Sequence, residues 1–387
     1  MHILVVASDY PNPSDPLEGV FERDQARALQ NAGHTVTYAA IDLRSARHRR
    51  RLGLRHFVED GLNVYLYSLP VSPLRAAYEP VGGACFRAIL RRVCAERGAP
   101  DIVHAHFLGV AAIAAPVCRE KNLPLVITEH TSALNAPDPG KALVKTMRKT
   151  YPLADALLAV SSLLAGSIYR HTGAKAVVVP NIIDTQSFSV VKEDNVPGEP
   201  FRFVASGFLI ERKGYDLLLR AAGDLRRRGY ALALTVFGDG PEREALEKLA
   251  ESEGVRDCVD FRGQCTRGEL GEAYPQMDAF VLASRRETFG VVYIEAMAAG
   301  LPVIATRCGG PEDFVTEENG ILIPVDDAAA LTDAMEHMML HRREYDSASI
   351  AADIRRKFAP ETIAARLTEL YEGVLSWFPK TCTAYEK

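Results

Sequence analysis

Short apolar strands and helices alternate along this chain of 387 residues, and the alternation runs through twice. Such alternation favours parallel sheets joined by right-handed crossovers. The first series predicts strands at 3–7, 35–40, 64–67, 101–106, 124–128, 156–160 and 176–179, with helices at 21–32 and 80–97. The second predicts strands at 201–205, 233–238, 259–261 and 279–283, with helices at 217–228, 242–253 and 270–274. The sequence therefore predicts an α/β fold with two doubly wound, Rossmann-like parallel sheets.

A turn-rich stretch separates the two series. It runs from Pro180 to Pro200 and has no helical periodicity, which is typical of a linker. We therefore expect an N-terminal domain over 1–185, a linker over 186–200 and a C-terminal domain over 201–358. A final helix at about 360–378 is amphipathic, and its apolar face can pack on either domain, including back on the first.

The composition is that of a globular enzyme. Hydrophobic residues make up 48% and charged residues 25%, and no apolar run approaches the ~20 residues that span a bilayer. The segment Met1–Ala7 enters a strand directly, without a basic leader. Seven cysteines without C-x-x-C spacing argue against a disulfide framework or a zinc site. We expect a cytoplasmic protein.

Basic residues gather in the first half of a chain whose net charge is −5. The densest cluster is Arg44–Arg51, with Arg55 close by. One interpretation is an ordinary solvated surface, and the other is a face for peripheral contact with an anionic membrane on its inner side. Nucleic acid is not expected, because few aromatic residues interleave with the cluster and the whole chain is acidic.

The segment from 279 to 310 reads as strand, loop, helix, strand, loop. Glu287 and Glu295 lie eight positions apart on either side of a Thr-Phe-Gly turn. In an open parallel sheet, loops at the carboxyl ends of strands bind ligands. The helix that begins near Val291 adds backbone N–H groups suited to an anion. A carboxylate beside an anion site suits a ligand with both hydroxyls and phosphate, such as a sugar nucleotide.

Two other enzyme classes fit less well. A dehydrogenase needs G-x-G-x-x-G after its first strand, but Ser8–Pro13 follows that strand and the first glycine is Gly19. The nearest match, 238–243, lacks the third glycine, and a P-loop is absent. The two carboxylates of a glycosidase must face each other across the glycosidic bond of the substrate. The eight-residue spacing of Glu287 and Glu295 does not require that geometry.

Several motifs, taken in order, resemble the retaining glycosyltransferases of family 4, which have the GT-B fold of two Rossmann-like domains facing a central cleft. The motifs are Gly33-His34, Asp101–His106, Pro180-Asn181 with Asp184 and Phe188, Lys213-Gly214, Gly238–Pro241, Phe261–Gly263, Glu287 with Glu295, Gly300–Pro302 and Gly309-Gly310. The resemblance implies transfer of a hexose-type sugar from a nucleoside-diphosphate sugar to a hydroxyl of a glycan or lipid-linked acceptor. Cell-surface polysaccharide or glycolipid biosynthesis is the expected setting.

The resemblance also implies roles for individual residues. Lys213, with Arg212, would neutralise the leaving diphosphate, Glu287 would contact the sugar, and Glu295 would bind the ribose hydroxyls. His130 would face the sugar and His106 the acceptor. Backbone groups of Gly19, Gly263, Gln264, Phe289, Gly290, Val291 and Val292 would complete the donor site. Many relatives have an arginine five or six residues before the lysine, where this chain has Gly207 and Phe208, so Arg212 is expected to substitute.

The donor is expected to be a UDP-, GDP- or ADP-sugar, with no cofactor and no metal, because no Asp-x-Asp cluster is present. Since fold does not fix substrate, three alternatives on the same scaffold remain open. A nucleotide-sugar epimerase would form product without an acceptor. A phosphorylase would use inorganic phosphate, and a binding module would show no turnover.

Overall fold

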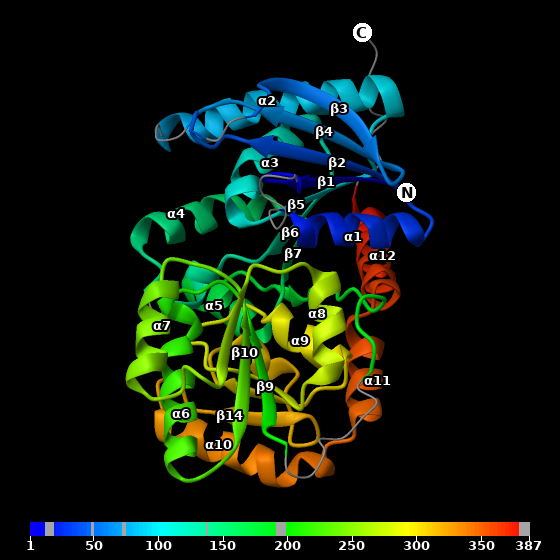
Figure 1. Cartoon of the computed structure of the whole chain (residues 1–387). Coiled ribbons are helices and arrows are strands. Elements are labelled where there is room, and N and C mark those ends of the chain that lie inside the picture. The colour runs from blue at the N-terminus through cyan, green and yellow to red at the C-terminus, as the bar shows by residue number, and fades with distance from the viewer. Residues whose placement is uncertain (12–18, 48–49, 72–74, 137, 191–198, 379–387) are drawn as a thin grey trace. The chain divides into compact units, whose positions relative to one another are not determined.

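The computed structural model describes residues 1–11, 19–47, 50–71, 75–136, 138–190 and 199–378 (Figure 1). The chain forms two compact units. The first comprises Met1–Val160, Leu164–Ile182 and the segment from Pro360, and the second comprises Ser161–Leu163 and Ile183–Ala359. No helix among the described residues is long and apolar enough to cross a membrane.

The first unit is built on an eight-stranded sheet in the order β3-β4-β2-β1-β5-β6-β7-β8. Its strands are β1 (His2–Ala7), β2 (Thr35–Asp42), β3 (Gly53–Glu59), β4 (Leu62–Ser68), β5 (Ile102–His106), β6 (Leu125–Glu129), β7 (Ala156–Ala159) and β8 (Val177–Val178). All neighbours pair in parallel except β3 and β4, which are antiparallel.

The edge strand β3 corrects the prediction of an all-parallel sheet. It forms a hairpin with β4 through Asp60-Gly61, and both turn residues have positive φ. Asp-Gly between two strands is a strong hairpin signal. None of the side chains of β3 is fully buried, and its sequence has no apolar run that would mark a strand.

Helices cover the sheet of the first unit. They are α1 (Val20–Asn31), α2 (Arg75–Arg97), α3 (Leu108–Lys121), α4 (Lys141–Thr150), α5 (Ser162–Thr172) and α12 (Pro360–Trp377), with 3-10 turns η1 (Ser132–Asn135) and η2 (Tyr151–Leu153). The helix α2 begins one turn before the predicted Pro80 and keeps that proline inside it.

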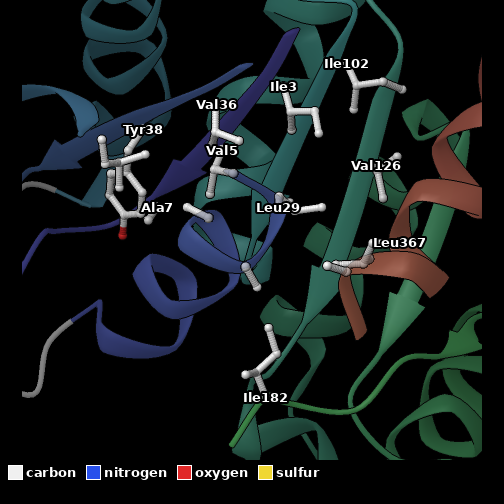
Figure 2. Close-up of a cluster of buried hydrophobic side chains, with 14 of the residues drawn as sticks. Ile3, Val5, Ala7, Leu29, Val36, Tyr38, Ile102, Val126, Ile182 and Leu367 are labelled. Carbon is white, nitrogen blue, oxygen red and sulfur yellow. The ribbon is translucent and has the colours of Figure 1, made fainter. Parts of the chain in front are cut away.

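The last helix belongs to the first unit. Figure 2 shows Leu367 of α12 in the same buried cluster as Ile3 and Val5 of β1 and Leu29 of α1. Burying a leucine or isoleucine side chain contributes about 1.5–3 kcal/mol, which explains why an amphipathic helix far away in sequence returns to this core. Thr368 Oγ1, which forms a hydrogen bond with His34 Nε2 at 2.8 Å, gives the helix a polar contact as well.

The second unit has a six-stranded, all-parallel sheet in the order β11-β10-β9-β12-β13-β14. Its strands are β9 (Phe201–Ser206), β10 (Leu232–Phe237), β11 (Val259–Gly263), β12 (Ala279–Leu282), β13 (Val303–Thr306) and β14 (Gly320–Ile323). Its helices are α6 (Tyr215–Arg227), α7 (Arg243–Ser252), α8 (Arg267–Ala273), α9 (Val291–Ala298), α10 (Ala328–His341) and α11 (Ser347–Phe358). Four 3-10 turns join them among the described residues, namely η3 (Glu211–Lys213), η4 (Tyr274–Gln276), η5 (Gly310–Asp313) and η6 (Arg342–Glu344).

Residues just before the second sheet already belong to the second unit. Phe188 is buried there, stacks on Tyr274 and accepts a hydrogen bond at its carbonyl from Arg355. The first unit ends at Ile182, whereas the sequence placed the boundary at 185. Residues 191–198 of the expected linker lie outside the described residues.

Strand order reverses once in each sheet. In the second unit the chain moves from β9 to β10 and β11 on one side, then returns to β12, β13 and β14 on the other. In the first unit the reversal falls between β1 and β5. Ligands of open α/β sheets bind outside the carboxyl ends of the strands at such reversals. The loops that follow β9 and β12, and those that follow β1 and β5, are therefore the places to look for a site.

Candidate functional site

The loops after β9 and β12 are joined by an ion pair. Lys213 Nζ, in η3, lies 2.6 Å from Glu287 Oε1, and the side chains are only 12% and 8% exposed. Ser284 Oγ donates to the same carboxylate oxygen at 2.8 Å. A carboxylate this buried needs such partners, because an unpaired charge is costly to desolvate. The structure thus brings together two of the predicted catalytic residues.

Backbone packing leaves little freedom around Lys213. The next residue, Gly214, has φ +68°, and a Cβ there would lie 2.0 Å from the carbonyl oxygen of Ala283 at the end of β12. Only glycine allows both the left-handed conformation and this close approach. The two loops therefore touch through backbone as well as through the ion pair.

Arg212 differs from its neighbour. Its carbonyl accepts a hydrogen bond of 2.7 Å from the N–H of Arg285. Its side chain is partly exposed, and none of the described residues pairs with the guanidinium. The side chain is thus available to an anionic ligand.

The loop that carries Glu287 continues into the N-terminus of α9. The N–H of Glu287 donates to Cys308 at 3.2 Å, and its carbonyl accepts from the N–H of Gly310 at 3.3 Å, so the loops after β12 and β13 are held together. Gly290 precedes α9, and Val291 and Val292 form its first turn, where N–H groups have no carbonyl one turn back. These N–H groups suit an anion.

Phe289 is buried among aromatic rings. Its ring centroid lies 5.5 Å from that of Phe314 and 5.6 Å from that of Phe358. The ring is therefore part of the core of the second unit, and only the backbone of Phe289 is left for a ligand.

Glu295 lies one turn into α9 and is 6% exposed. Its Oε1 is 3.3 Å from Nε of Arg267, the first residue of α8. Burial, together with the nearby charges of Glu269 and Glu295, raises the pKa of the Cys265 thiol to about 11. The structure therefore places Glu295 beside the segment that contains Gly263 and Gln264, the predicted base-binding residues.

Tyr215 lies near both Glu287 and Cys265, and Cys265 belongs to the segment beside Glu295. Burial raises the pKa of its phenol, and the nearby charges of Glu287 and Cys265 raise it further. Its hydroxyl donates to the carbonyl of Gly207 at 3.1 Å, in the loop after β9. The carbonyl of Gly263, at the end of β11, accepts a hydrogen bond of 2.7 Å from the N–H of Gly238, which follows β10. The predicted donor residues of the second unit thus form one neighbourhood.

Three histidines lie together in the first unit, where His104 and His106 are buried and His130 is partly exposed. His106 Nδ1 is 3.0 Å from His130 Nε2, and His104 bonds Tyr371 at 2.6 Å and Thr128 at 2.7 Å. His106 is 1% exposed, and its Nε2 has no hydrogen-bond partner among the described residues. Burial lowers the pKa of His104 and of His130 to about 3, and it lowers that of His106 well below its ordinary value. All three imidazoles are neutral at pH 7.

A buried carboxylate orients the backbone of His130. Glu129 Oε1 accepts from the N–H groups of His130 and Thr131 at 2.9 and 2.7 Å, and Tyr151 donates to Oε2 at 2.8 Å. Burial raises the pKa of Glu129 despite these bonds. The end of β6, where His130 sits, is therefore rigidly held.

Gly19 precedes α1 at the reversal in the first sheet. A Cβ there would lie 2.7 Å from the carbonyl oxygen of Asp9. The Tyr38 hydroxyl donates to the same oxygen at 3.0 Å. Residues 12–18, which form the rest of the predicted glycine loop, lie outside the described residues.

The arginine cluster divides into two sets. Arg44 pairs with Asp9 and Asp42, and Arg50 Nε lies 2.5 Å from Asp42, with its side chain only 9% exposed. These two arginines neutralise buried carboxylates at the ends of β1 and β2. Arg47 and Arg51 are exposed, and Arg49 lies outside the described residues. Arg44 and Arg50 are therefore taken up by internal pairs, and contact of this cluster with a membrane stays a prediction.

Sequence reasoning missed several partners of the site residues, namely Ser284, Arg285, Arg267 and Asp216. Ser284 lies two residues after β12, so its place near a strand end was a usable signal. The others give none, because charged residues at helix starts (Arg267 and Asp216) and in loops (Arg285) are ordinary. Among the described residues, no group of three or more His, Cys, Asp or Glu side chains could hold a metal ion.

Comparison with known proteins assigns the family. Residues 189–355 match the model described as glycosyl transferases group 1, and residues 19–187 match that of glycosyltransferase family 4. A GDP-mannose-dependent alpha-mannosyltransferase of Mycobacterium tuberculosis (strain CDC 1551 / Oshkosh) is 31% identical over 368 residues, covering 89% of this chain and 90% of that protein. A putative teichuronic acid biosynthesis glycosyltransferase, TuaC of Bacillus subtilis (strain 168), is 27% identical over 366 residues, covering 89% and 91%.

Solved structures show the same fold. Sucrose-phosphate synthase from Thermosynechococcus elongatus has a TM-score of 0.81 at 20% identity, covering 97% of this chain and 99% of that one. Anabaena HepE, solved in complex with UDP and glucose, has a TM-score of 0.72 at 16% identity, covering 96% and 100%. With its two parallel-sheet units and matches along both halves, this chain belongs to the group 1 and family 4 glycosyltransferases of GT-B fold.

Proposed function

We propose that this enzyme transfers a hexose-type sugar from a nucleoside-diphosphate sugar to a hydroxyl of a glycan or lipid-linked acceptor, with retention of configuration, in cell-surface polysaccharide or glycolipid biosynthesis. The buried Lys213–Glu287 pair beside the N-terminus of α9 is the observation that carries the proposal. It combines a cation, a carboxylate and free N–H groups at the strand-order reversal of the second sheet. The two relatives named above support the transferase class and the setting.

In the proposed reaction, the bond between the anomeric carbon and the diphosphate oxygen breaks while the acceptor oxygen bonds to the same face. The acceptor proton passes to the leaving phosphate oxygen. Lys213 and the side chain of Arg212 neutralise the charge that develops on the diphosphate, and the N–H groups of 289–292 add to this stabilisation. Glu287 accepts hydrogen bonds from sugar hydroxyls. No metal or other cofactor is needed in this proposal.

Glu295 is proposed to accept hydrogen bonds from both ribose hydroxyls, with its charge balanced by Arg267. The base would lie against backbone of Gly263 and Gln264, which recognises shape more than base identity. In the first unit, we propose that neutral His130 faces the transferred sugar and that His106 serves the acceptor. The unpartnered Nε2 of His106 supports a role toward a bound hydroxyl.

The donor is proposed to be a UDP-, GDP- or ADP-sugar. GDP-mannose is the first to test, because the relative at 31% identity is GDP-mannose-dependent by name. A cytoplasmic location is proposed from six described cysteines that are all free, as in a reducing compartment. Peripheral membrane contact would rest on Arg47 and Arg51, together with Arg49.

The test is a thermal-shift screen with UDP, GDP, ADP and their sugar conjugates in the presence of EDTA, followed by product analysis. A ligand that binds only the folded state raises Tm. We expect one nucleoside diphosphate to raise Tm, and its sugar conjugate to be consumed only when an acceptor is added. Conversion of the nucleotide sugar without acceptor would instead indicate an epimerase, and a shift without any turnover would indicate a binding module.

A further inference from the structure

The side chain of Arg285 is hydrogen-bonded to several segments of the second unit. Arg285 lies between Ser284 and Glu287, three residues after β12, and its side chain is 22% exposed. Its contacts reach three other segments of the second unit. They are η3 before α6, the first turn of α6, and the turn at Asp326 before α10.

The first set of contacts holds the backbone next to Lys213. The N–H of Arg285 donates to the carbonyl of Arg212 at 2.7 Å, and the guanidinium donates through Nη1 to the carbonyl of Glu211. Both carbonyls belong to η3, the short turn that ends at Lys213. Arg285 therefore holds the backbone of η3 through two hydrogen bonds, one from its own backbone and one from its side chain.

The second set holds the start of α6, which follows Lys213 and Gly214. Asp216 receives Nη1 of Arg285 at 3.0 Å and Nη2 at 2.9 Å, one on each carboxylate oxygen. Burial alone would raise the pKa of Asp216, but the hydrogen bonds and charge of Arg285 lower it below its ordinary value. Asp326 receives Nε at 2.6 Å and completes the set. The planar guanidinium suits this arrangement, which an ammonium group does not reproduce.

We infer that Arg285 is a positioning residue, which acts by fixing the segment of Lys213 against the segment of Glu287. This inference rests on the proposed function of that site. The Lys213–Glu287 pair spans 74 positions in the sequence, and Arg285 spans 69 to reach Asp216, so the two ties run in parallel between the same segments.

The argument predicts a specific kinetic pattern. Without the guanidinium, η3 keeps the backbone bond from the N–H of Arg285 and the Lys213–Glu287 pair but loses the side-chain contacts at Glu211 and Asp216. Lys213 Nζ can then shift relative to the reacting phosphate. A shift of about 1 Å in a catalytic group lowers the rate by about 100-fold. The side-chain hydrogen bonds of Arg285 reach Glu211, Asp216 and Asp326, whereas Glu295 pairs with Arg267 of α8. Nucleotide binding should therefore change much less than turnover.

The experiment compares Arg285→Gln, Arg285→Lys and Asp216→Asn with a matched control, Arg228→Gln. Arg228 also pairs with two carboxylates, Asp333 at 3.2 Å and Glu336, but these join α6 to α10 away from the site. We expect Arg285→Gln to lower kcat about 100-fold with less than a fivefold change in donor KM. Asp216→Asn should show a smaller loss, Arg285→Lys a partial rescue, and Arg228→Gln unchanged kinetics at a similar Tm. Equal losses in kcat for the Arg228 and Arg285 variants, or full activity of Arg285→Gln, would overturn the inference.

A second measurement needs no substrate. Amide hydrogen exchange should increase in 207–216 of Arg285→Gln but not of Arg228→Gln, because only the former releases η3. Should the wild-type enzyme transfer no sugar, the proposed function fails, and exchange still decides whether Arg285 holds the segment. Unchanged exchange in 207–216 would contradict the positioning role whatever the activity.

Discussion

Lys213 Nζ lies 2.6 Å from Glu287 Oε1, and this pair closes the gap between the loops that follow β9 and β12. Each charge balances the other. A diphosphate bound to Lys213 would leave Glu287 with the Ser284 hydroxyl and the sugar hydroxyls as partners. The ion pair thus links the two loops, and it also supplies the positive charge of Lys213 that the proposed reaction uses.

Replacing Lys213 by alanine should abolish transfer and also destabilise the second unit by about 3 kcal/mol, because a buried carboxylate loses its countercharge. Urea unfolding of the variant measures the second effect. The double variant Lys213→Met with Glu287→Gln removes both charges, so it should regain most of the stability and none of the activity. Equal free energies of unfolding for wild type and Lys213→Ala would contradict a stabilising role of the Lys213–Glu287 ion pair.

Replacing Glu295 by alanine should remove the ligand-induced rise in Tm and weaken nucleoside-diphosphate binding by about 10- to 100-fold, since hydrogen bonds to a charged group contribute about 1.5–3 kcal/mol. Isothermal titration calorimetry measures the affinity. Glu312→Ala serves as a control, because within the described part of the chain that carboxylate accepts a hydrogen bond from its own turn, at the N–H of Gly309. Normal nucleotide affinity in Glu295→Ala would exclude the ribose role.

Acid should destabilise the first unit through its buried histidines. His104 and His130 have a folded pKa of about 3, below the unfolded value of about 6.5, so the unfolded state binds more protons between these limits. Each histidine then costs up to about 1.4 kcal/mol for every pH unit below 6.5. Glu129 acts in the opposite direction, because its folded pKa is raised.

The difference between wild type and His104→Gln isolates one histidine, since both proteins keep Glu129. Urea midpoints between pH 7.5 and 5 should fall more steeply for wild type than for the variant. Parallel curves for the two proteins would mean that His104 takes up its proton in the folded state without cost.

A substitution at Leu367 tests whether α12 packs on the core of the first unit. Leu367 is fully buried against β1 and α1, so Leu367→Ala should destabilise the first unit by about 2–5 kcal/mol. Leu370→Ala, at a partly buried position of the same helix, should cost less. Thermal unfolding followed by circular dichroism compares the two. Equal and small effects would place α12 outside the core of this unit.

Much of the site was predictable because it depends on local pattern. Glu287, Gly290 and Glu295 follow a strand and enter a helix, an order that hydrophobic periodicity shows directly. The Asp60-Gly61 hairpin was equally local and was missed, since its outer strand has no apolar run. The free side chain of Arg212 and the buried ring of Phe289 were not predictable, because exposure depends on what packs from elsewhere.

The sequence by itself determined two strand-helix series, the strand ends that carry Lys213 and Glu287, and the family of the chain. Periodicity and turn chemistry are properties of neighbouring residues, so they are visible without coordinates. Only the tertiary structure decided that α12 joins the first unit, that Arg44 and Arg50 serve internal carboxylates, and that Arg267 and Arg285 hold the site. These pairings join residues far apart in the chain, and such residues become neighbours only once the sheets and helices have packed.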